Sequence, residues 1–477
     1  MDTNVATSEF DNLVASGMPV GEVIAVNSFM VKIKGLHPVN IGSLVVFETG
    51  SRGFVQRVLA DHVEVLYMGA DLPMVGAVVT VKSNQLITNV GTGFIGRVIG
   101  PDGRPLDGKG PITADAGWKI FNAAPKIHER EQLNELIETG VTVIDSLFPI
   151  VRGQRLAVIG DGKSGKSSLV TQIGINQKDT GAITIYVLIA KRKSEIDALI
   201  AKLESSGAME SSIVVVSTIF DPLVSTYLAP YLGCAIGEYL WQVGERDVVI
   251  IYDDLTSHAQ IYREISLVSR VNPGRDTYPG DIFYIHSSLL ERAGKLHRSH
   301  KSMTAIPVVL AAGGDITAYL PTNIISITDG QWILDNEIFH SGVRPAISSG
   351  LSVTRVGGRG HSDAQKYISS QTLKAIAAYK RALEFSHFGS EMAANTAREL
   401  RIGQQINEII TQLPGEHYSL PAQRMMLDIV LAQADGEQVS VTEMKRHVNG
   451  IAKTVDDQNY EIVRESLKSM AITRSTA

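Results

Sequence analysis

Residues 160–167 read Gly-Asp-Gly-Lys-Ser-Gly-Lys-Ser, which is the phosphate-binding pattern G-x-x-x-x-G-K-[ST]. The apolar run 156–159 precedes the pattern, and the helix-forming run 167–173 follows it. Glycines at this spacing let backbone N–H groups surround phosphate oxygens, while the lysine reaches the outer phosphates and the final hydroxyl can bind Mg²⁺. An ordinary glycine turn would need neither flanking element. The sequence therefore predicts binding of a nucleoside triphosphate.

A second acidic element supports this prediction and suggests a metal. The buried-type run 248–252 ends in Asp253 and Asp254. P-loop ATPases hold their metal with an Asp at such a strand end, so we expect Asp253 and Ser167 to hold Mg²⁺. Both acids could instead cap a helix that begins near Thr256, and this alternative applies above all to Asp254. The predicted nucleotide contacts of the loop itself are Gly160, Asp161, Gly162, Lys163, Ser164, Gly165, Lys166 and Ser167.

A residue that could activate water is missing from the place where it is expected. Hydrolysis needs a carboxylate at the end of the strand beside the P-loop strand. Here that strand, 183–190, ends in Lys191, Arg192 and Lys193, and a protonated lysine cannot act as a base. Glu195 follows in the predicted first turn of a helix, where an acid favours the helix dipole. We expect a site that binds nucleotide without fast turnover.

Composition limits the partners and the compartment. A net charge of −6 supplies no basic field, so no nucleic-acid partner is expected. The single cysteine, Cys234, excludes an intramolecular disulfide and is interpreted as a buried thiol. The acidic N-terminus lacks the pattern of a presequence. The longest apolar runs, such as 305–312, fall far short of the ~20 residues that span a bilayer, so any membrane association must come through partners.

The order of elements predicts three domains. Residues 1–86 form a small N-terminal β-barrel domain, residues 87–362 a nucleotide-binding P-loop ATPase domain, and residues 363–477 a C-terminal all-α helical bundle. In the second domain strands alternate with helices, which calls for a parallel sheet with helices on both faces. The β-type runs are 23–26, 30–33, 44–47, 54–59, 62–66 and 78–81 in the first domain, and 156–159, 183–190, 213–217 and 247–252 in the second.

Further motifs, from about Gly21 onward, resemble the alpha subunits of F-type ATP synthases. The resembling segments are 108–112, 145–150, 152–155, 227–231, 273–281, 319–331, 342–346, 350–357 and 388–390. The beta subunits have a glutamate-bearing segment after the second strand, and this chain has none. The resemblance implies a recombinase-like P-loop domain between the barrel and the helical bundle.

The resemblance also implies an assembly. Three alpha and three beta subunits alternate around a central rotor shaft, the gamma subunit, with a peripheral stalk that includes the delta subunit. The alpha subunit is itself non-catalytic and regulatory, binds Mg·ATP or ADP, and serves a translocase that couples ATP synthesis or hydrolysis to proton or other ion transport. The chain is then expected on the cytoplasmic face of a bacterial cell membrane. The coupling ion is set by a membrane sector that this chain does not encode.

Site residues follow from the same resemblance. Arg355 falls on the family's arginine finger, which acts in trans on the beta subunit's nucleotide, and Ser326 falls near that interface. Positions equivalent to Phe339, Arg344 and Pro345 surround the adenine of alpha's own nucleotide. From the residues alone, Arg355 could form a surface ion pair. Ser326 could satisfy local backbone, and Phe339 could pack in the core.

Several positions depart from the family pattern. The family P-loop usually reads G-D-R-Q-T-G-K-T, whereas this chain has Gly-Lys-Ser at 162–164. Lys191 stands where Gln is usual, and Leu-Ala-Ala at 310–312 stands where E-T-Q is common. The glutamines that usually approach adenine do not align cleanly around 412–418. We expect Lys163 and Lys191 to replace the lost polar contacts with direct charge on the phosphates.

Two other functions compete with this interpretation. A self-sufficient homohexameric ATPase motor of a secretion or flagellar export system would need a catalytic carboxylate where Lys191 stands. A structural scaffold without nucleotide is the third interpretation, and the intact Lys166, Ser167 and Asp253 argue against it.

Overall fold

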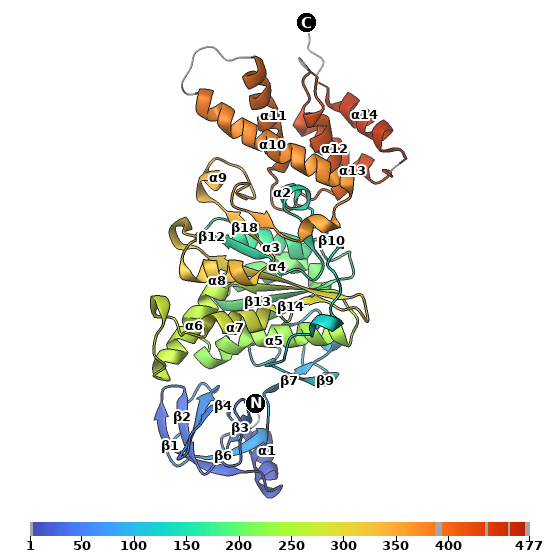
Figure 1. Ribbon diagram of the computed structural model, residues 1–477. Helices are drawn as coiled ribbons and strands as arrows, with labels where there is room; N and C mark the ends of the chain where they lie inside the picture. Colours follow the sequence, from blue (N-terminus) through green and yellow to red (C-terminus); the bar gives the residue numbers. More distant parts are fainter. Residues whose placement is uncertain (1–2, 387–393, 435–436, 457, 473–477) are drawn as a thin grey trace. The chain divides into compact units, whose positions relative to one another are not determined.

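The computed structural model describes residues 3–386, 394–434, 437–456 and 458–472 (Figure 1). These residues divide into two compact units. The first unit comprises Met1–Arg130 and Gly181–Val308, and the second comprises Glu131–Thr180 and Val309–Ala477. The predicted domain boundaries after residues 86 and 362 remain a prediction, and the resembling segment 388–390 lies outside the described residues.

The first unit begins with helix α1 (Thr3–Ala15) and a closed six-stranded barrel, drawn in blue in Figure 1. Its strands pair in the order β1-β2-β5-β4-β3-β6, and every pairing is antiparallel. Apolar side chains fill the interior, with Val45, Phe47 and Val65 fully or almost fully buried. The predicted small barrel is confirmed. The strands are β1 (Val20–Asn27), β2 (Met30–Lys34), β3 (Leu44–Phe47), β4 (Arg52–Val58), β5 (Val63–Tyr67) and β6 (Val78–Ser83).

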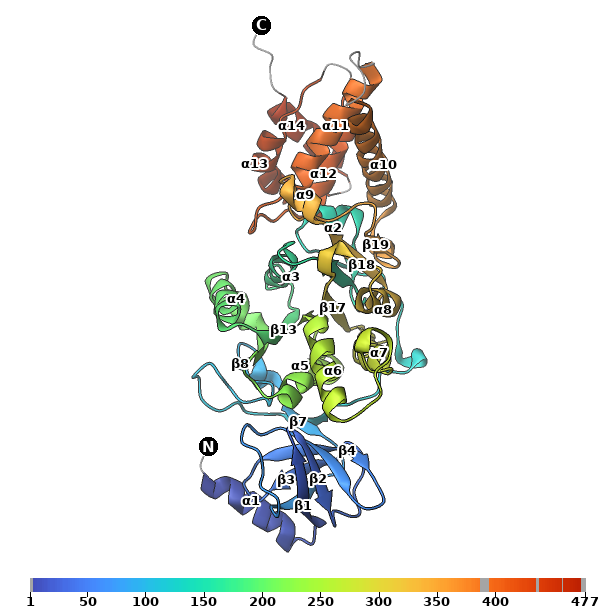
Figure 2. The same cartoon turned by 90° about the vertical axis from the view of Figure 1, so that its left-hand side faces the viewer.

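The rest of the first unit is built on a parallel sheet with the strand order β17-β15-β13-β14-β8. Strand β13 pairs with β14 and β15, so the prediction that strand 183–190 lies directly beside the P-loop strand is wrong. Its bounds are β8 (Val98–Ile99), β13 (Ile183–Lys191), β14 (Ser212–Thr218), β15 (Val248–Asp253) and β17 (Ser302–Leu310). Figure 2 shows helix α4 (Lys193–Ser205) on one side of β13, and α5 (Leu223–Gln242) and α6 (Leu255–Val268) on the other. Strands covered on both faces read as continuous apolar runs, which is why β13 and β15 could be predicted.

Smaller elements complete this unit. Strand β16 (Gly294–Lys295) pairs antiparallel with β17, and β7 (Ile87–Val90) pairs with β9 (Ala116–Lys119). The predicted buried thiol of Cys234 is confirmed, since Cys234 lies fully buried in α5 and burial raises its pKa to about 12. Helix α7 (Ile282–Leu290) also belongs to this unit.

The second unit contains the P-loop strand. Strand β12 (Ala157–Gly160) runs parallel to β18 (Gly330–Leu334), which pairs antiparallel with β19 (Val353–Thr354). A separate two-stranded sheet joins β10 (Leu136–Ile137) and β11 (Ile150–Val151). The helices before residue 363 are α2 (Thr142–Leu147), α3 (Lys166–Ile175), α8 (Tyr319–Ile327) and α9 (Asn336–His340).

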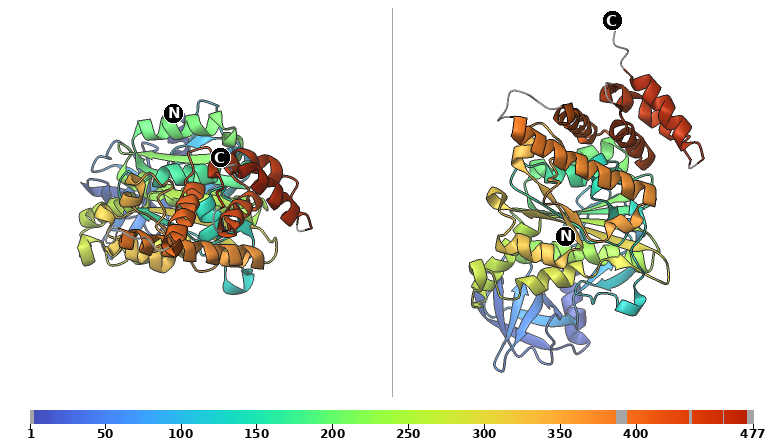
Figure 3. Two further views of the ribbon diagram at one scale, coloured as in Figure 1. Left: turned by 90° about the horizontal axis from the view of Figure 1, so that it is seen from above. Right: turned by 45° about the horizontal axis from the view of Figure 1, so that its top comes forward.

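The C-terminal part of the second unit is helical, as predicted. Figure 3 shows its helices, orange to red, gathered beside one another. Met425, Met444 and Leu467 are fully buried among them. The helices are α10 (Asp363–Ser386), α11 (Ala394–Ile410), α12 (Leu420–Leu431), α13 (Val441–Ala452) and α14 (Tyr460–Ala471). In the described parts of the chain, no helix combines the length and the apolar character needed to traverse a bilayer.

Candidate functional site

The P-loop connects β12 to α3 and folds around its own lysine. Lys166 Nζ donates to the carbonyl oxygens of Gly160 and Asp161 at 2.9 and 2.6 Å. The hydroxyl of Ser164, which is 1% exposed, also donates to Asp161 O, at 2.8 Å. A Cβ on Gly160 would lie 2.7 Å from the carbonyl oxygen of Leu334, so no larger residue fits there. Gly165 has φ +94°, a left-handed conformation that suits glycine.

Asp161 ties this loop to a neighbouring segment. Its Oδ1 accepts the N–H of Gly162 at 2.6 Å, and its Oδ2 accepts the amide of Asn336 at 3.4 Å. Lys163 is exposed and has φ +60°, a strained conformation for a residue other than glycine. Lys163 therefore occupies an exposed turn of the P-loop.

The aromatic residue predicted beside the adenine lies next to the P-loop. Phe339, at the end of α9, is half-buried, and the guanidinium carbon of Arg344 lies 4.5 Å from its ring centre. A Cβ placed on Gly165 would lie 3.8 Å from Cε2 of Phe339. Pro345 follows directly and its carbonyl accepts the N–H of Ile347 at 2.9 Å. A ring and a guanidinium beside a phosphate loop can stack with a nucleotide base.

The glutamines near this segment are engaged with the backbone. Gln412, which is 5% exposed, accepts the N–H of Thr142 at 2.6 Å and donates to the carbonyl of Gly140 at 2.9 Å. Gln172 Oε1 accepts the N–H of Gly415 at 2.9 Å. These amides hold the 412–416 turn in place, which leaves Phe339 and Arg344 as the better candidates for contact with a base.

In the first unit, Lys191 and two carboxylates form a compact ionic cluster. Lys191 Nζ lies 2.8 Å from Asp253 Oδ1 and 3.1 Å from Asp254 Oδ2. The three side chains are only 15, 9 and 17% exposed, respectively. Burial disfavours the ammonium, but the attraction of Asp253 and Asp254 outweighs it and raises the pKa of Lys191 above its usual value. The ammonium of Lys191 is thus paired with two carboxylates. We had expected it to contact the phosphates of the nucleotide instead.

Two acids near this cluster have local roles at helix starts. Asp254 is the N-cap of α6, and its Oδ1 accepts the N–H of Ser257 at 2.7 Å. The capping alternative therefore holds for Asp254. Glu195 lies in the first turn of α4, as expected, and accepts the N–H of Arg192 at 3.1 Å. Both acids supply the acceptors that the first helical N–H groups need.

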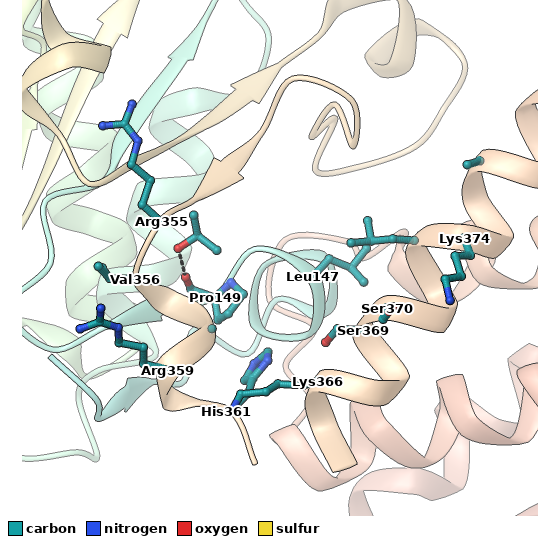
Figure 4. A pocket seen from close by; sticks show the side chains of 14 residues that line it. Leu147, Pro149, Arg355, Val356, Arg359, His361, Lys366, Ser369, Ser370 and Lys374 are labelled. Carbon is teal, nitrogen blue, oxygen red and sulfur yellow. Dashed lines mark hydrogen bonds between the residues drawn. The ribbon is translucent and has the colours of Figure 1, made fainter. Parts of the chain in front are cut away.

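Arg355, the predicted finger, follows β19 in the second unit. Its guanidinium donates to the carbonyls of Thr328 and Ile325 at 3.2 and 3.5 Å. Within the described ranges it contacts no carboxylate, so the surface ion pair that the residue type alone suggested is not seen. Arg355 lines a cavity of about 660 Å³. Its side chain points away from Lys366 and Lys374 (Figure 4).

Other cations line the same cavity. Arg359 comes from the segment after Arg355, and Lys366 and Lys374 come from α10 (Figure 4). Lys366 forms a salt bridge with Asp363 at 3.3 Å. The rest of the lining is supplied by Leu147, Pro149, Thr354, Val356, Gly358, His361, Ser369, Ser370, Leu373 and Ala377.

Family models match both the site and the helical region. Residues 140–354 match the nucleotide-binding domain of the ATP synthase alpha/beta family, and residues 362–477 match the C-terminal domain of ATP synthase alpha/beta chains. The ATP synthase subunit alpha of Caldanaerobacter subterraneus subsp. tengcongensis is 39% identical over 460 residues, which cover 96% of this chain and 90% of that protein. The alpha subunit of Levilactobacillus brevis is 40% identical over 447 residues, 93% of this chain and 86% of that protein. The chain belongs to the ATP synthase alpha/beta family, as an alpha subunit.

Two donor residues of this alpha subunit were expected to hold Mg²⁺, and they fit the ion unequally. Ser167 is exposed at the start of α3, directly after the P-loop lysine, and its hydroxyl is a ligand type that suits Mg²⁺. Asp253 does not fit, because the ammonium of Lys191 already lies against its Oδ1. Among the described residues, no group of three His, Cys, Asp or Glu side chains could hold a metal.

Some features of this alpha subunit were not anticipated from the sequence. The bond between Asn336 and Asp161 joins α9 to the P-loop, and no motif indicates it. Lys366, Ser370 and Lys374 could have been grouped, since spacings of four place them on one face of a helix. Ser326 Oγ donates to the carbonyl of Thr322 at 3.0 Å, which is the local backbone bond considered as its alternative role.

Proposed function

We propose that this alpha subunit binds ATP or ADP at its P-loop without hydrolysing it, and that it lends Arg355 to the catalytic site of a beta-type partner. The observation that carries the proposal is the end of β13. There Lys191 is held by two carboxylates, at the position after the second strand where beta subunits carry a glutamate-bearing segment and this chain has none. A lysine held in this way neither accepts a proton nor aligns water as a base.

Nucleotide binding is assigned to the P-loop and the segment around Phe339. The backbone N–H groups at the start of α3 and the ammonium of Lys166 suit phosphate oxygens, and Lys163 adds charge at the loop surface. Phe339, Arg344 and Pro345 form the wall for the adenine. When bound, Mg²⁺ would screen phosphate charge, and Ser167 is the residue suited to hold it.

The role of Arg355 in trans is supported by its chemistry and its surroundings. It is exposed, and its guanidinium is held by two backbone carbonyls rather than neutralised by an acid of the described chain. A guanidinium stays charged, and its fork of donors matches the oxygens of a transferring phosphoryl group. Ser326 is proposed as a lesser contributor to the same interface.

The partners follow from this role. We infer an alternating hexamer with three beta subunits, a gamma rotor shaft at its centre, a peripheral stalk with a delta subunit, and a membrane sector that translocates ions. The chain would then lie peripherally on the cytoplasmic face of the cell membrane, in an enzyme that couples ATP chemistry to ion transport.

The test compares turnover by the purified chain with turnover by its complex with the beta partner. The chain alone should hydrolyse ATP negligibly, and the complex should be active. Arg355→Ala should assemble normally and lower the turnover of the complex by about 10³-fold or more, the usual contribution of such a finger. Equal turnover with and without Arg355 would remove its role. Vigorous turnover by the chain alone would favour a self-sufficient motor.

A further inference from the structure

Two buried histidines connect the helices α5, α6 and α7 of the first unit, which lie beside one another in Figure 2. His258 lies in α6 and His286 in α7, and their exposed fractions are only 0 and 1%. His258 Nδ1 is 3.2 Å from His286 Nε2, and His258 Nε2 is 3.1 Å from the carbonyl oxygen of Tyr227 in α5. We call His258 and His286 the histidine pair.

The contacts of the histidine pair determine where its protons lie. A carbonyl oxygen can only accept, so His258 Nε2 carries the proton that it donates to Tyr227. In a neutral ring Nδ1 is then an acceptor, and His286 must donate to it from Nε2. His286 Nδ1 is left as an acceptor, and it is buried without a hydrogen-bond partner among the described residues. The geometry therefore fits two neutral rings.

The rings packed against His258 are neutral as well. Tyr227 stacks on His258 with the ring centres 5.2 Å apart, and Tyr231 meets it edge-on at 5.9 Å. Burial raises the pKa of both phenols above its usual value, so neither ionises near neutral pH. These side chains offer no counter-ion to a protonated imidazole.

The charged groups near these helices are engaged elsewhere. Asp281, at the start of α7, accepts the hydroxyl of Tyr262 from α6 at 2.7 Å. Arg292, which follows α7, forms a buried ion pair with Glu238 of α5 at 2.7 Å.

Burial therefore dominates the titration of the histidine pair. It lowers the pKa of His258 to about 4. It also lowers the pKa of His286 well below its usual value, and the neighbouring His258 adds to this effect.

We propose that the histidine pair is a pH-dependent contact that holds α7 against α6 while both rings are neutral and releases α7 when the rings take up protons. A proton added to His286 Nδ1 would create a buried N–H without an acceptor and a buried charge without a counter-ion. A histidine exposed to water takes up its proton near pH 6.5. As the pH falls below that value, the separated helices bind more protons than the packed ones, so acid favours separation.

The test measures hydrogen–deuterium exchange of the purified full-length chain at pH 7 and pH 5, with each rate divided by the intrinsic exchange rate at that pH. In peptides from α6 and α7 the opening equilibrium constant should rise by about tenfold or more at pH 5. Peptides from the barrel strands β1 to β6 are the internal reference, and their constants should change by less than about threefold. This device does not depend on the proposed nucleotide binding.

His286→Gln is the informative variant, because its amide can still donate to His258 Nδ1 but cannot take up a proton. Its rise at pH 5 should be at least about threefold smaller than that of the wild type. His128→Gln is the matched control, since it makes the same change at an exposed position of the same unit, and its rise should equal that of the wild type.

Three results would overturn the inference. The first is equal protection of α6 and α7 at the two pH values in the wild type, and this comparison decides even if His286→Gln does not fold. The second is a parallel loss of protection in the barrel, which would mean that acid weakens the whole unit. The third is an undiminished rise in His286→Gln, which would assign the pH dependence to other groups.

Discussion

Two arginines lie around the same residue, Asp329, and differ in what they contact. Arg155 donates to both carboxylate oxygens of Asp329, at 2.8 and 3.0 Å. Arg355 reaches the same residue through its backbone, since its N–H donates to the carbonyl of Asp329 at 3.0 Å, while its guanidinium contacts two other carbonyls. The carboxylate therefore neutralises Arg155 and leaves the charge of Arg355 to be used elsewhere.

The two arginines therefore differ in role. The charge of Arg155 stabilises the fold, whereas the charge of Arg355 remains available to a partner. Arg155 and Asp329 are each about one-quarter exposed, at 24 and 23%, and they form a two-pronged ion pair. The carbonyl contacts of Arg355 orient its guanidinium without cancelling its charge. Breaking such long contacts to neutral oxygens costs little, so Arg355 can turn toward a phosphate of a neighbouring subunit.

The largest effect on turnover is expected when the guanidinium of Arg355 is replaced by another positively charged group. Arg355→Lys keeps a positive charge but loses the fork of donors, so turnover of the assembled complex should fall by about 10²-fold. Its resistance to denaturant should match that of the wild type. The measurement pairs steady-state ATPase rates with urea unfolding. Wild-type turnover in Arg355→Lys would show that charge alone suffices and that the guanidinium geometry is irrelevant.

Arg155→Ala should lower the stability of the chain and leave the turnover of the complex nearly unchanged. Removing one partner of a partly buried pair leaves Asp329 without its guanidinium, and the free energy of unfolding should fall by about 2 kcal/mol. Assembled complexes should keep turnover within about tenfold of the wild type, because Arg355 keeps its backbone anchor. Asp329→Asn serves as the control, since it removes the same ion pair from the other side. If Arg155→Ala abolishes turnover without loss of stability, the division between the two arginines is wrong.

A smaller effect is expected from the cations that share the cavity with Arg355. Arg359→Ala and Lys374→Ala each remove an exposed charge from its lining. Turnover should change by no more than a few-fold, while the salt dependence of assembly with the beta partner should weaken, because exposed charges act mainly through screened attraction. Assembly measured across an ionic-strength series checks this. A loss of turnover as large as that of Arg355→Ala would mean that the cavity acts as one catalytic unit.

The sequence predicts the elements of this fold well where a local pattern dictates them. The barrel runs, strands β12 to β15 and the helical C-terminal part follow from periodicity and from apolar runs. Strand β17 was seen only as an apolar run, because a continuous apolar run has no period that separates a buried strand from a buried helix. The P-loop could be placed from its motif, since glycine spacing and flanking elements are both local.

The partners of charged side chains could not be predicted in this way. Lys191 was expected on phosphates, but it lies on Asp253 and Asp254, which are more than sixty positions away and meet it through strand order and a bulge at Ala190. From the sequence alone, Arg355 could have formed an ion pair. In the structure the nearby carboxylate, that of Asp329, pairs with Arg155. Such choices depend on tertiary geometry, to which a single sequence gives no direct access.

Ser326→Ala should have the smallest effect on turnover and stability, and it is the reference against which the arginine variants are compared. The hydroxyl of Ser326 donates to the carbonyl of Thr322, four residues earlier on α8, and the side chain is exposed. A bond of this kind satisfies the backbone locally, so its loss should change the free energy of unfolding by less than about 0.5 kcal/mol. Turnover of the complex should remain within about twofold, measured beside Arg355→Lys. A fall in turnover as large as that of Arg355→Lys would show that Ser326 contacts the partner's nucleotide. Arg355 would then not be the sole contribution of this surface to the partner's site.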